Sequence, residues 1–182
     1  MKVFGVDPGS DRTGYGCIET DGSRHNLMAC GAIATSPRAA LPDKLLTIHT
    51  ALVRLLAEHR PDCVAVEGVF YAANVRSALT LGHARGVALL AAVQAGYQVF
   101  EYAPAEIKRA VVGYGRAEKH QVGEMVRLLL GLAEAPEPHD AADALAVAIC
   151  HVHSVGSGPA RAAIEHAAAG KRVAKTWREY RP

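Results

Sequence analysis

A run of strand-forming residues near the N-terminus ends abruptly at an acidic residue and a Pro-Gly pair. The run covers residues 2–6, and Asp7, Pro8 and Gly9 follow it directly. Proline lacks the amide hydrogen that a central strand needs, and glycine tolerates the dihedral angles of a tight turn. Strand character resumes at Thr13, so the pattern predicts a hairpin that holds Asp7 at the end of its first strand. A buried carboxylate there is costly unless a cation meets it, although Asp is also a favoured turn residue that caps its own backbone.

The periodicity of the rest of the chain predicts an α/β fold with a five-stranded mixed sheet flanked by helices. Three strands form an antiparallel meander, and two short apolar runs add parallel strands after intervening helices. The expected strands are residues 3–7, 13–20, 27–35, 63–66 and 98–102. The expected helices are residues 42–59, 73–95, 105–112, 118–130 and 139–150.

The chain of 182 residues is long enough for one domain with a substantial core, and half of it is hydrophobic. We expect a domain over residues 1–153 and a flexible basic tail over residues 154–182. The tail has six Lys or Arg residues against two Glu, a net charge of +4, whereas the whole chain is +2, which leaves −2 for the domain. Bulk charge alone therefore does not favour nucleic-acid binding, and a polyanion would need local basic groups or metal ions.

Several patterns bear on the compartment in which the protein works. The four cysteines form no CxxC pair and lie in apolar runs, which favours buried free thiols over a zinc site. The N-terminus has no signal-peptide pattern, because Asp7 and Pro8 interrupt its only apolar run. No apolar stretch reaches the ~18 residues of a membrane helix. We therefore expect a cytoplasmic protein.

Three further acidic residues occupy positions that call for a partner, as Asp7 does. Glu67 ends the short apolar strand at residues 63–66, and ligand sites in open α/β sheets lie at C-terminal strand ends. Asp140 and Asp143 are three residues apart, so they share one face of the first turn of a helix. The helix dipole alone favours acids there, but the remainder of this helix is apolar and should be buried.

The four acids Asp7, Glu67, Asp140 and Asp143 together predict a site for hard divalent cations. Carboxylates that lie close together raise each other's pKa unless a cation neutralises them. Mg²⁺ takes oxygen ligands, and a pair of such ions can activate a water for phosphodiester hydrolysis. The chain has no His/Cys spacing for zinc, no GxxxxGK[ST] loop and no GxSxG elbow. These residues favour a nuclease with two Mg²⁺ ions, or Mn²⁺ in their place.

A basic, glycine-flanked loop at residues 113–116 lies near the expected acidic strand ends. Lys108, Arg116 and Lys119 cluster around it. Such charges usually form a solvated face, but in this setting they could equally hold the phosphates of a nucleic acid.

The long helix expected over residues 73–95 is apolar on more than one face. Ala78, Gly82 and Gly86 are four residues apart, so they form a groove of small residues that lets another helix approach closely. Internal packing against the sheet would explain this groove, and so would a homodimer interface, which the second apolar face favours.

Four long stretches of the sequence closely resemble the RuvC family of bacterial crossover junction endodeoxyribonucleases. They read VDPGSDRTGYG, VAVEGVFYAANVRSALTLGHARG, EYAPAEIKRAVVGYGRAEKHQV and HDAADALAVAICHVH, and the match covers about residues 1–154. The resemblance implies a ribonuclease-H-like fold, a homodimer and Mg²⁺ dependence. It also implies paired, symmetric nicking of four-way Holliday junctions in recombination and repair, alongside the RuvA–RuvB branch-migration complex.

The resemblance also implies roles for single residues. By position, the four acids match the acidic quartet of the family. Phe70 matches the aromatic residue that the family places against junction bases, and Lys108 and Lys119 match its basic residues near the cleaved backbone. The tail carries no matching motif, so nothing known of the family transfers to it.

Other interpretations stay open at this point. One is a related ribonuclease-H-like nuclease that acts on ribosomal RNA precursor, which would be expected to lack the second stretch. Others are a junction-binding scaffold, or an ATP-binding protein of the actin-like superfamily, which needs a second lobe. The sequence does not decide whether Asp140 or Asp143 ligates metal directly, or whether His139 is a proton donor or an exposed residue at the start of its helix.

Overall fold

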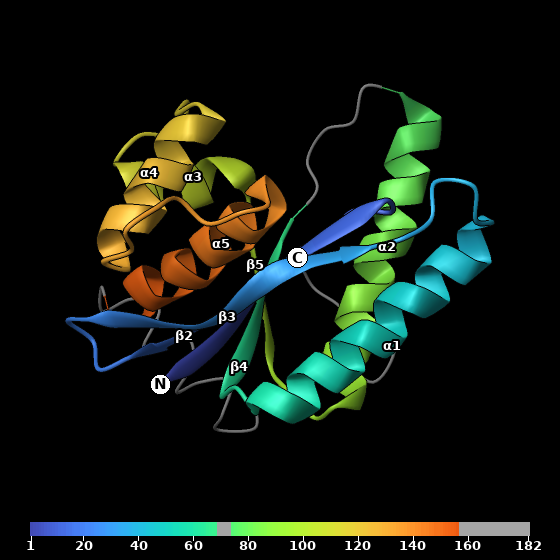
Figure 1. The fold of residues 1–182 in the computed structure, drawn as a ribbon, viewed down its shortest axis with the longest axis horizontal. Helices are drawn as coiled ribbons and strands as arrows, with labels where there is room; N and C mark the ends of the chain where they lie inside the picture. The colour runs from blue at the N-terminus through green and yellow to red at the C-terminus, as the bar shows by residue number, and fades with distance from the viewer. Residues whose placement is uncertain (69–73, 157–182) are drawn as a thin grey trace, which may run out of the picture.

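A five-stranded mixed sheet forms the centre of the computed structural model, which describes residues 1–68 and 74–156 (Figure 1). Three strands make an antiparallel meander, and two more add in parallel beyond the first strand, in the order β3-β2-β1-β4-β5. The strands are β1 (Lys2–Asp7), β2 (Arg12–Thr20), β3 (His25–Ala34), β4 (Cys63–Glu67) and β5 (Val99–Tyr102). The predicted mixed sheet is confirmed, and each strand lies within two residues of its expected bounds.

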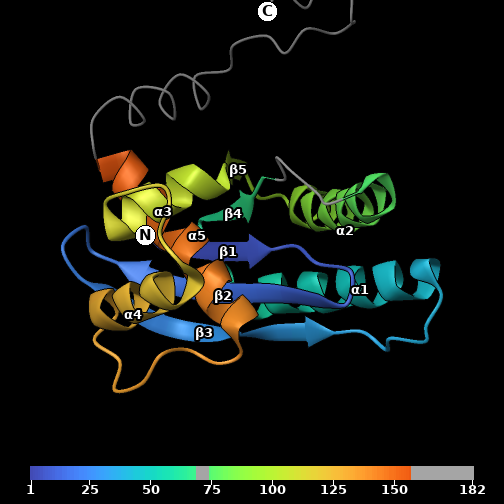
Figure 2. The same cartoon turned by 90° about the horizontal axis from the view of Figure 1, so that it is seen from above.

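Helices cover both faces of this sheet (Figures 1 and 2). One face packs against α1 and α2, and the other against α5, which α3 and α4 flank. The helices are α1 (Leu41–His59), α2 (Val75–Gln94), α3 (Pro104–Val112), α4 (Lys119–Leu129) and α5 (His139–Gly156). Among the described residues, no helix combines the length and apolar character needed to cross a membrane.

Local signals explain where the helices begin and end. α1 has a proline in its first turn and ends at Arg60, which adopts a left-handed conformation with φ of 46°. α3 likewise ends at Gly113, where φ is 93°. α5 is longer than expected, because it continues through Ser154 to Gly156. The first three residues of the predicted tail are therefore helical, and the Ser154 hydroxyl donates to the Cys150 carbonyl at 2.8 Å.

The alternation of β1 divides its side chains between two cores. Phe4 and Val6 are buried against α1 and α2, together with Val64 and Val66 of β4. Val3 points to the opposite face, where it joins the core formed with α3, α4 and α5. Because alternate residues of a strand point to opposite faces, Asp7 shares the α5 face of the sheet with Val3.

Glycines on β1 and β2 allow α5 to lie directly against the sheet. A Cβ atom at Gly5 would be 2.0 Å from the carbonyl oxygen of Ala144, and one at Gly14 would be 2.0 Å from that of Asp140. Real Cβ atoms do not approach backbone oxygens so closely, so any larger residue would force α5 away. The glycines therefore fix the distance between the sheet and the helix turn that carries Asp140 and Asp143.

A buried polar network anchors the other half of α5. The side chain of His151 lies between Tyr102, whose hydroxyl is 2.8 Å from Nδ1, and Cys63, whose Sγ is 3.2 Å from Nε2. Burial lowers the pKa of His151 to about 4 and raises the pKa of the Cys63 thiol to about 12. All four cysteines are free, and three of them are buried, which confirms the predicted free thiols.

We expect Gly5→Ala to destabilise the protein by about 1–3 kcal/mol or more, because overpacking at this contact displaces α5. The matched control is Gly123→Ala in α4, where an added Cβ meets no atom within 4 Å. This control should stabilise the protein by up to about 1 kcal/mol, because alanine is the better helix former. Urea denaturation of both variants measures the difference. Equal stabilities would contradict the role given to Gly5.

Candidate metal-binding and DNA-contacting site

A hollow of about 290 Å³ opens at the C-terminal ends of β1 and β4, beside α5. Three carboxylates line it, and so do two lysines. The polar lining residues are Asp7, Glu67, Asp143, Lys108 and Lys119. The apolar part of the lining comes from α3, α4 and α5. Acidic and basic groups from both halves of the chain therefore meet in one pocket.

The sheet register brings the first two carboxylates together. β1 and β4 are adjacent and parallel, and Val6 pairs with Val66, so Asp7 and Glu67 follow at the same edge of the sheet and on the same face. Asp143 approaches from the first turns of α5, which the glycine contacts hold against β1 and β2. Three of the four acids expected at this site, from two strand ends and one helix start, thus line the same pocket.

The groups around Asp7 do not supply enough positive charge to keep its carboxyl ionised at neutral pH. Burial is the largest effect on its pKa, and a hydrogen bond shared with Glu67 and the negative charges of Glu67 and Asp143 add to it. Together these effects raise the pKa of Asp7 from 3.8 to about 9, against a smaller lowering by Lys119. A divalent cation would reverse this balance, because it favours the ionised form of every carboxylate that it contacts. The oxygen-only donor set also fits a hard cation such as Mg²⁺.

Asp140 does not line this pocket. Its Oδ2 atom lies 3.7 Å from Nη1 of Arg12, and both residues line a neighbouring hollow of about 560 Å³. In the described part of the chain, no three His, Cys, Asp or Glu side chains are arranged so that they could hold a metal ion. The structure thus gathers three of the four predicted acids, and coordination of one ion would require their side chains to move closer together.

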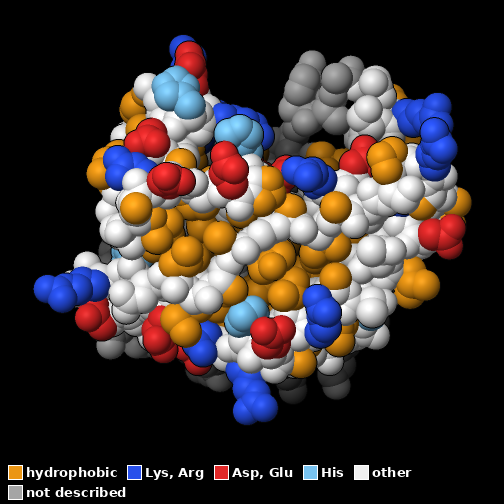
Figure 3. All heavy atoms as spheres, in the orientation of Figure 1, with side chains coloured by type: hydrophobic (Ala, Val, Ile, Leu, Met, Phe, Trp, Pro, Cys, Tyr) orange, Lys and Arg blue, Asp and Glu red, His pale blue; other side chains and the backbone are white. Residues whose placement is uncertain are grey.

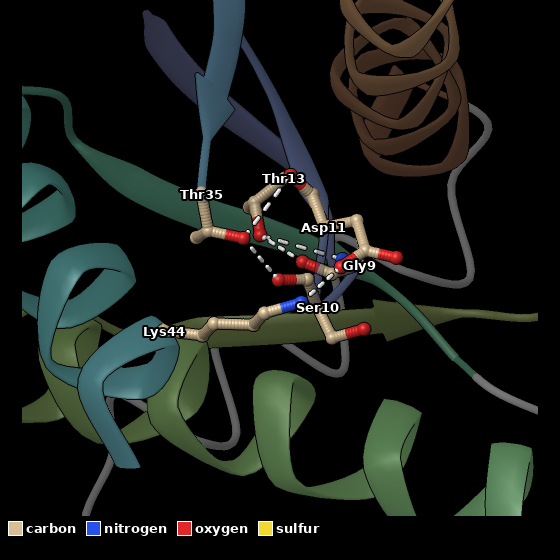
Figure 4. Close-up of polar contacts among 6 residues, drawn as sticks. All are labelled: Gly9, Ser10, Asp11, Thr13, Thr35 and Lys44. Atoms are coloured by element: carbon tan, nitrogen blue, oxygen red, sulfur yellow. Dashed lines mark hydrogen bonds and ion pairs between the residues drawn. The ribbon is translucent and has the colours of Figure 1, made fainter. Parts of the chain in front are cut away.

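The turn between β1 and β2 is held by side chains around it (Figure 4). The Thr13 hydroxyl donates to the carbonyl of Gly9 at 2.7 Å, and the Thr35 hydroxyl donates to that of Ser10 at 2.8 Å. Lys44 of α1 forms an ion pair with Asp11. These contacts fix the chain between Asp7 and the arginine that pairs with Asp140.

Sequence reasoning did not identify Arg12 as part of the site. Its position five residues after Asp7, at the start of the strand that returns along β1, is the signal that could have found it. The strand pairing of Asp7 with Gly14 places Arg12 just beyond the acidic edge of the sheet.

The predicted DNA-contacting residues differ in their placement. Lys119 donates a hydrogen bond to Asp143 with Nζ and Oδ2 2.9 Å apart, and this bond raises the pKa of Lys119. Lys108 is half-buried in the pocket wall, whereas Arg116 is exposed and outside the pocket lining. Phe70 lies outside the described residues. His139 is exposed at the start of α5, which agrees with the interpretation of it as a helix-entry residue.

Comparison with known proteins places this chain in a family. The family model described as crossover junction endodeoxyribonuclease RuvC matches residues 3–151. The chain belongs to the RuvC family. A curated RuvC of Heliobacterium modesticaldum is 53% identical, and the alignment covers 88% of this chain and 99% of that protein. A RuvC of Trichlorobacter lovleyi is 50% identical over the whole of both chains, so the C-terminal segment of this protein also has a counterpart there.

Solved structures agree with this assignment. Two structures of Thermus thermophilus RuvC superpose with a TM-score of 0.80 each, and each comparison covers 87% of this chain and 97% of the other. They are 37% and 35% identical to this chain, and the second is a complex with Holliday junction substrate. The yeast mitochondrial Holliday junction resolvase Ydc2, at 13% identity and a TM-score of 0.61, shares the fold. The predicted family, nuclease class and ribonuclease-H-like fold are confirmed.

The buried position of Asp7 gives a testable dependence of stability on pH. The pKa of Asp7 is raised in the folded protein, so below about pH 4 the carboxyl is protonated in both the folded and the unfolded state. As the pH rises toward 9, only the folded state keeps this proton, and the free energy of unfolding falls. Without metal, Asp7→Asn should therefore melt at a higher temperature than the native protein at pH 8 and at nearly the same temperature at pH 4. Each kcal/mol corresponds to about 2–4 °C for a chain of this size.

Melting curves in the presence of a chelator test this expectation. The control is Glu58→Gln on the exposed side of α1, which should change the melting temperature little at either pH. If the native protein is as stable as Asp7→Asn at pH 8 without metal, ionisation of Asp7 does not lower the stability of the fold.

Proposed function

We propose that the protein is a metal-dependent endonuclease that resolves four-way Holliday junctions by paired symmetric nicks in homologous recombination and DNA repair. The observation that carries this proposal is the meeting of Asp7, Glu67 and Asp143 with two lysines in one pocket of a RuvC-family fold. The Holliday junction bound to Thermus thermophilus RuvC supports the choice of substrate. The protein is proposed to act in the cytoplasm, together with the RuvA–RuvB branch-migration complex.

The acidic residues are the proposed ligands of the metal. Family membership supports dependence on a divalent metal, and we propose two Mg²⁺ ions per site, with Mn²⁺ able to replace them. Asp7, Glu67 and Asp143 would hold the metal from β1, β4 and α5, and Asp140 would join them after leaving Arg12. When bound, such ions generate a nucleophile from water and offset the negative charge that develops on the phosphate.

The basic and aromatic residues are proposed to hold the junction. Lys108 and Lys119 line the pocket from α3 and α4, where they can meet phosphate oxygens beside the carboxylates. Arg116 is exposed on the loop between these helices and can contact the backbone farther away. Phe70 is proposed to stack on an unpaired base, an interaction worth about 1–3 kcal/mol per base.

An exposed apolar stripe along α2 is the proposed homodimer interface. Val75, Leu79, Leu90 and Val93 are between 50% and 76% exposed, which is unusual for large apolar side chains on one helix. Figure 3 shows hydrophobic side chains among polar ones on the side of the molecule where α1 and α2 lie. A symmetric pair of protomers would present two identical sites to a junction with matching two-fold symmetry. This geometry would account for the proposed paired nicks.

Two glycines in this stripe support the same interface. An added Cβ at Gly82 or Gly86 meets no atom of the described residues within 4 Å, so nothing in that part of the protomer requires either residue to be glycine. Glycine inside a helix costs about 1 kcal/mol relative to alanine. A second helix that approaches closely would account for this cost, because only small residues leave room for it.

We expect Gly86→Leu to convert a dimer into monomers that keep the fold, because the longer side chain faces open space in each protomer and separates the two helices. Sedimentation measures the mass, and circular dichroism confirms the helix content. Leu128, which is 59% exposed on α4, provides the control: Leu128→Ala should leave the dimer intact. A native protein that sediments as a monomer at micromolar concentration would contradict the proposed interface.

The proposed chemistry separates junction binding from junction cleavage. Asp7→Asn and Glu67→Gln each remove a negative charge that faces phosphates, so binding should stay unchanged or become tighter. Cleavage should fall by orders of magnitude, because the carboxylates that hold the metal are incomplete. Gel shifts without metal and nicking assays with Mg²⁺ measure the two activities on a mobile four-way junction, with duplex and single-stranded DNA for comparison.

Glu58→Gln again serves as the control, and it should bind and cleave as the native protein does. Cleavage that persists in Asp7→Asn and Glu67→Gln would remove these carboxylates from the mechanism. A loss of binding as large as the loss of cleavage would do the same.

A further inference from the structure

A lysine already occupies part of the carboxylate pocket. Nζ of Lys119 lies 2.9 Å from Oδ2 of Asp143, and both side chains line the pocket together with Asp7 and Glu67. The side chain of Lys119 is 79% exposed, whereas that of Asp143 is 21% exposed. The ammonium group therefore approaches the carboxylates from the solvent side, the direction from which a dissolved cation would also arrive.

The position of Lys119 in its own helix gives it no local reason to be basic. Lys119 is the first residue of α4, and the first turn contains no acidic residue, while Glu118 before it is the N-cap residue and takes part in a capping box. A positive charge at the N-terminus of a helix is unfavourable, because the backbone amides already carry partial positive charge there. An ion pair with one largely exposed partner also adds little to stability. The contact with Asp143 is therefore the feature of Lys119 that matters for the pocket.

The ammonium group also acts on Asp7, across the pocket from Asp143. It lowers the pKa of Asp7, and the hydrogen bond with Asp143 raises the pKa of Lys119. Lys108 lines the same pocket but forms no ion pair with a carboxylate among the described residues. Lys119 is thus distinguished from its neighbour by direct contact with an acid.

We propose that the Lys119 ammonium is an exchangeable counter-ion, which neutralises Asp143 in the metal-free protein and leaves it when a divalent cation binds. The inference rests on the proposed function, because it takes Asp143 as a metal ligand. Oδ2 of Asp143 cannot serve the ammonium and a divalent cation equally well, since the two positive charges repel each other. Metal binding therefore includes the cost of breaking this ion pair, so Lys119 weakens the affinity of the empty site.

The exchange has a consequence for the DNA. Lys119 has a long, flexible and exposed side chain, so the released ammonium can reach a phosphate oxygen at the mouth of the pocket. A phosphate that holds Lys119 away from Asp143 would in turn favour metal binding. By linkage, each event then strengthens the other by the same factor. The site would bind metal more tightly with the junction in place than without it.

Calorimetric titration of the full-length protein with Mg²⁺, without DNA and at constant ionic strength, tests the proposal. Lys119→Met removes the counter-ion, and Lys108→Met removes a positive charge from the same pocket without breaking an ion pair. We expect the Mg²⁺ dissociation constant of Lys119→Met to be about two- to fivefold lower than that of Lys108→Met, the range for an ion pair of this exposure. Lys119→Arg keeps the positive charge beside Asp143, so its Mg²⁺ dissociation constant without DNA should equal that of the native protein.

The outcomes separate this inference from the proposed function. If Lys119→Met binds Mg²⁺ no more tightly than Lys108→Met, while the native protein binds it and cleaves junctions, the exchange is refuted and the proposed function stands. If no protein of the set binds Mg²⁺ with or without a junction, both are refuted. Circular dichroism of each variant establishes that it is folded, which the exposure of Lys119 leads us to expect.

Discussion

The contact between α5 and the glycines of β1 and β2 is the constraint on which the site depends. Gly5 and Gly14 meet backbone oxygens of α5, and a Cβ at Gly16 would be 2.6 Å from the side chain of Leu145. These glycines face one side of two paired strands, so the helix lies closer to the sheet than ordinary side chains would allow. The acid on its first turns can therefore reach acids at the ends of the strands.

This close packing opposes the electrostatics of the site. Asp7 is buried beside Glu67, and Asp143 adds a third negative charge, so the metal-free pocket favours a protonated Asp7. Repulsion between these acids would separate α5 from the strands if the helix were weakly held. The arrangement persists because α5 is packed along its length. Glycines lie beneath its first half, and His151 in its second half contacts Tyr102 and Cys63. A cation bound here would relieve a strain that the core imposes.

Much of this arrangement could be predicted from the sequence, because the signals were local. Strand ends at Asp7 and Glu67 and the helix start before Asp143 follow from turn residues and periodicity. The separation of Asp140 from the other acids could not be predicted in this way. It depends on an ion pair with Arg12, which the β1–β2 turn brings back toward the end of β1. The glycine contacts were also missed. The close approach of α5 to these glycines becomes visible only when the two strands are paired and the helix is packed against them.

Helix α5 combines a packing role with the presentation of an acid to the pocket. Cys63 begins β4 and Glu67 ends it, while His151 and Asp143 are eight residues apart on α5. The contact of Cys63 with His151 therefore holds the helix in register with the strand, two helical turns from the carboxylates. The buried half of the helix sets its backbone position, so rotation of the acidic side chains is the movement left to bring them closer to the proposed cation. A rigid frame with rotatable carboxylates would let such a site bind and release a metal without unfolding.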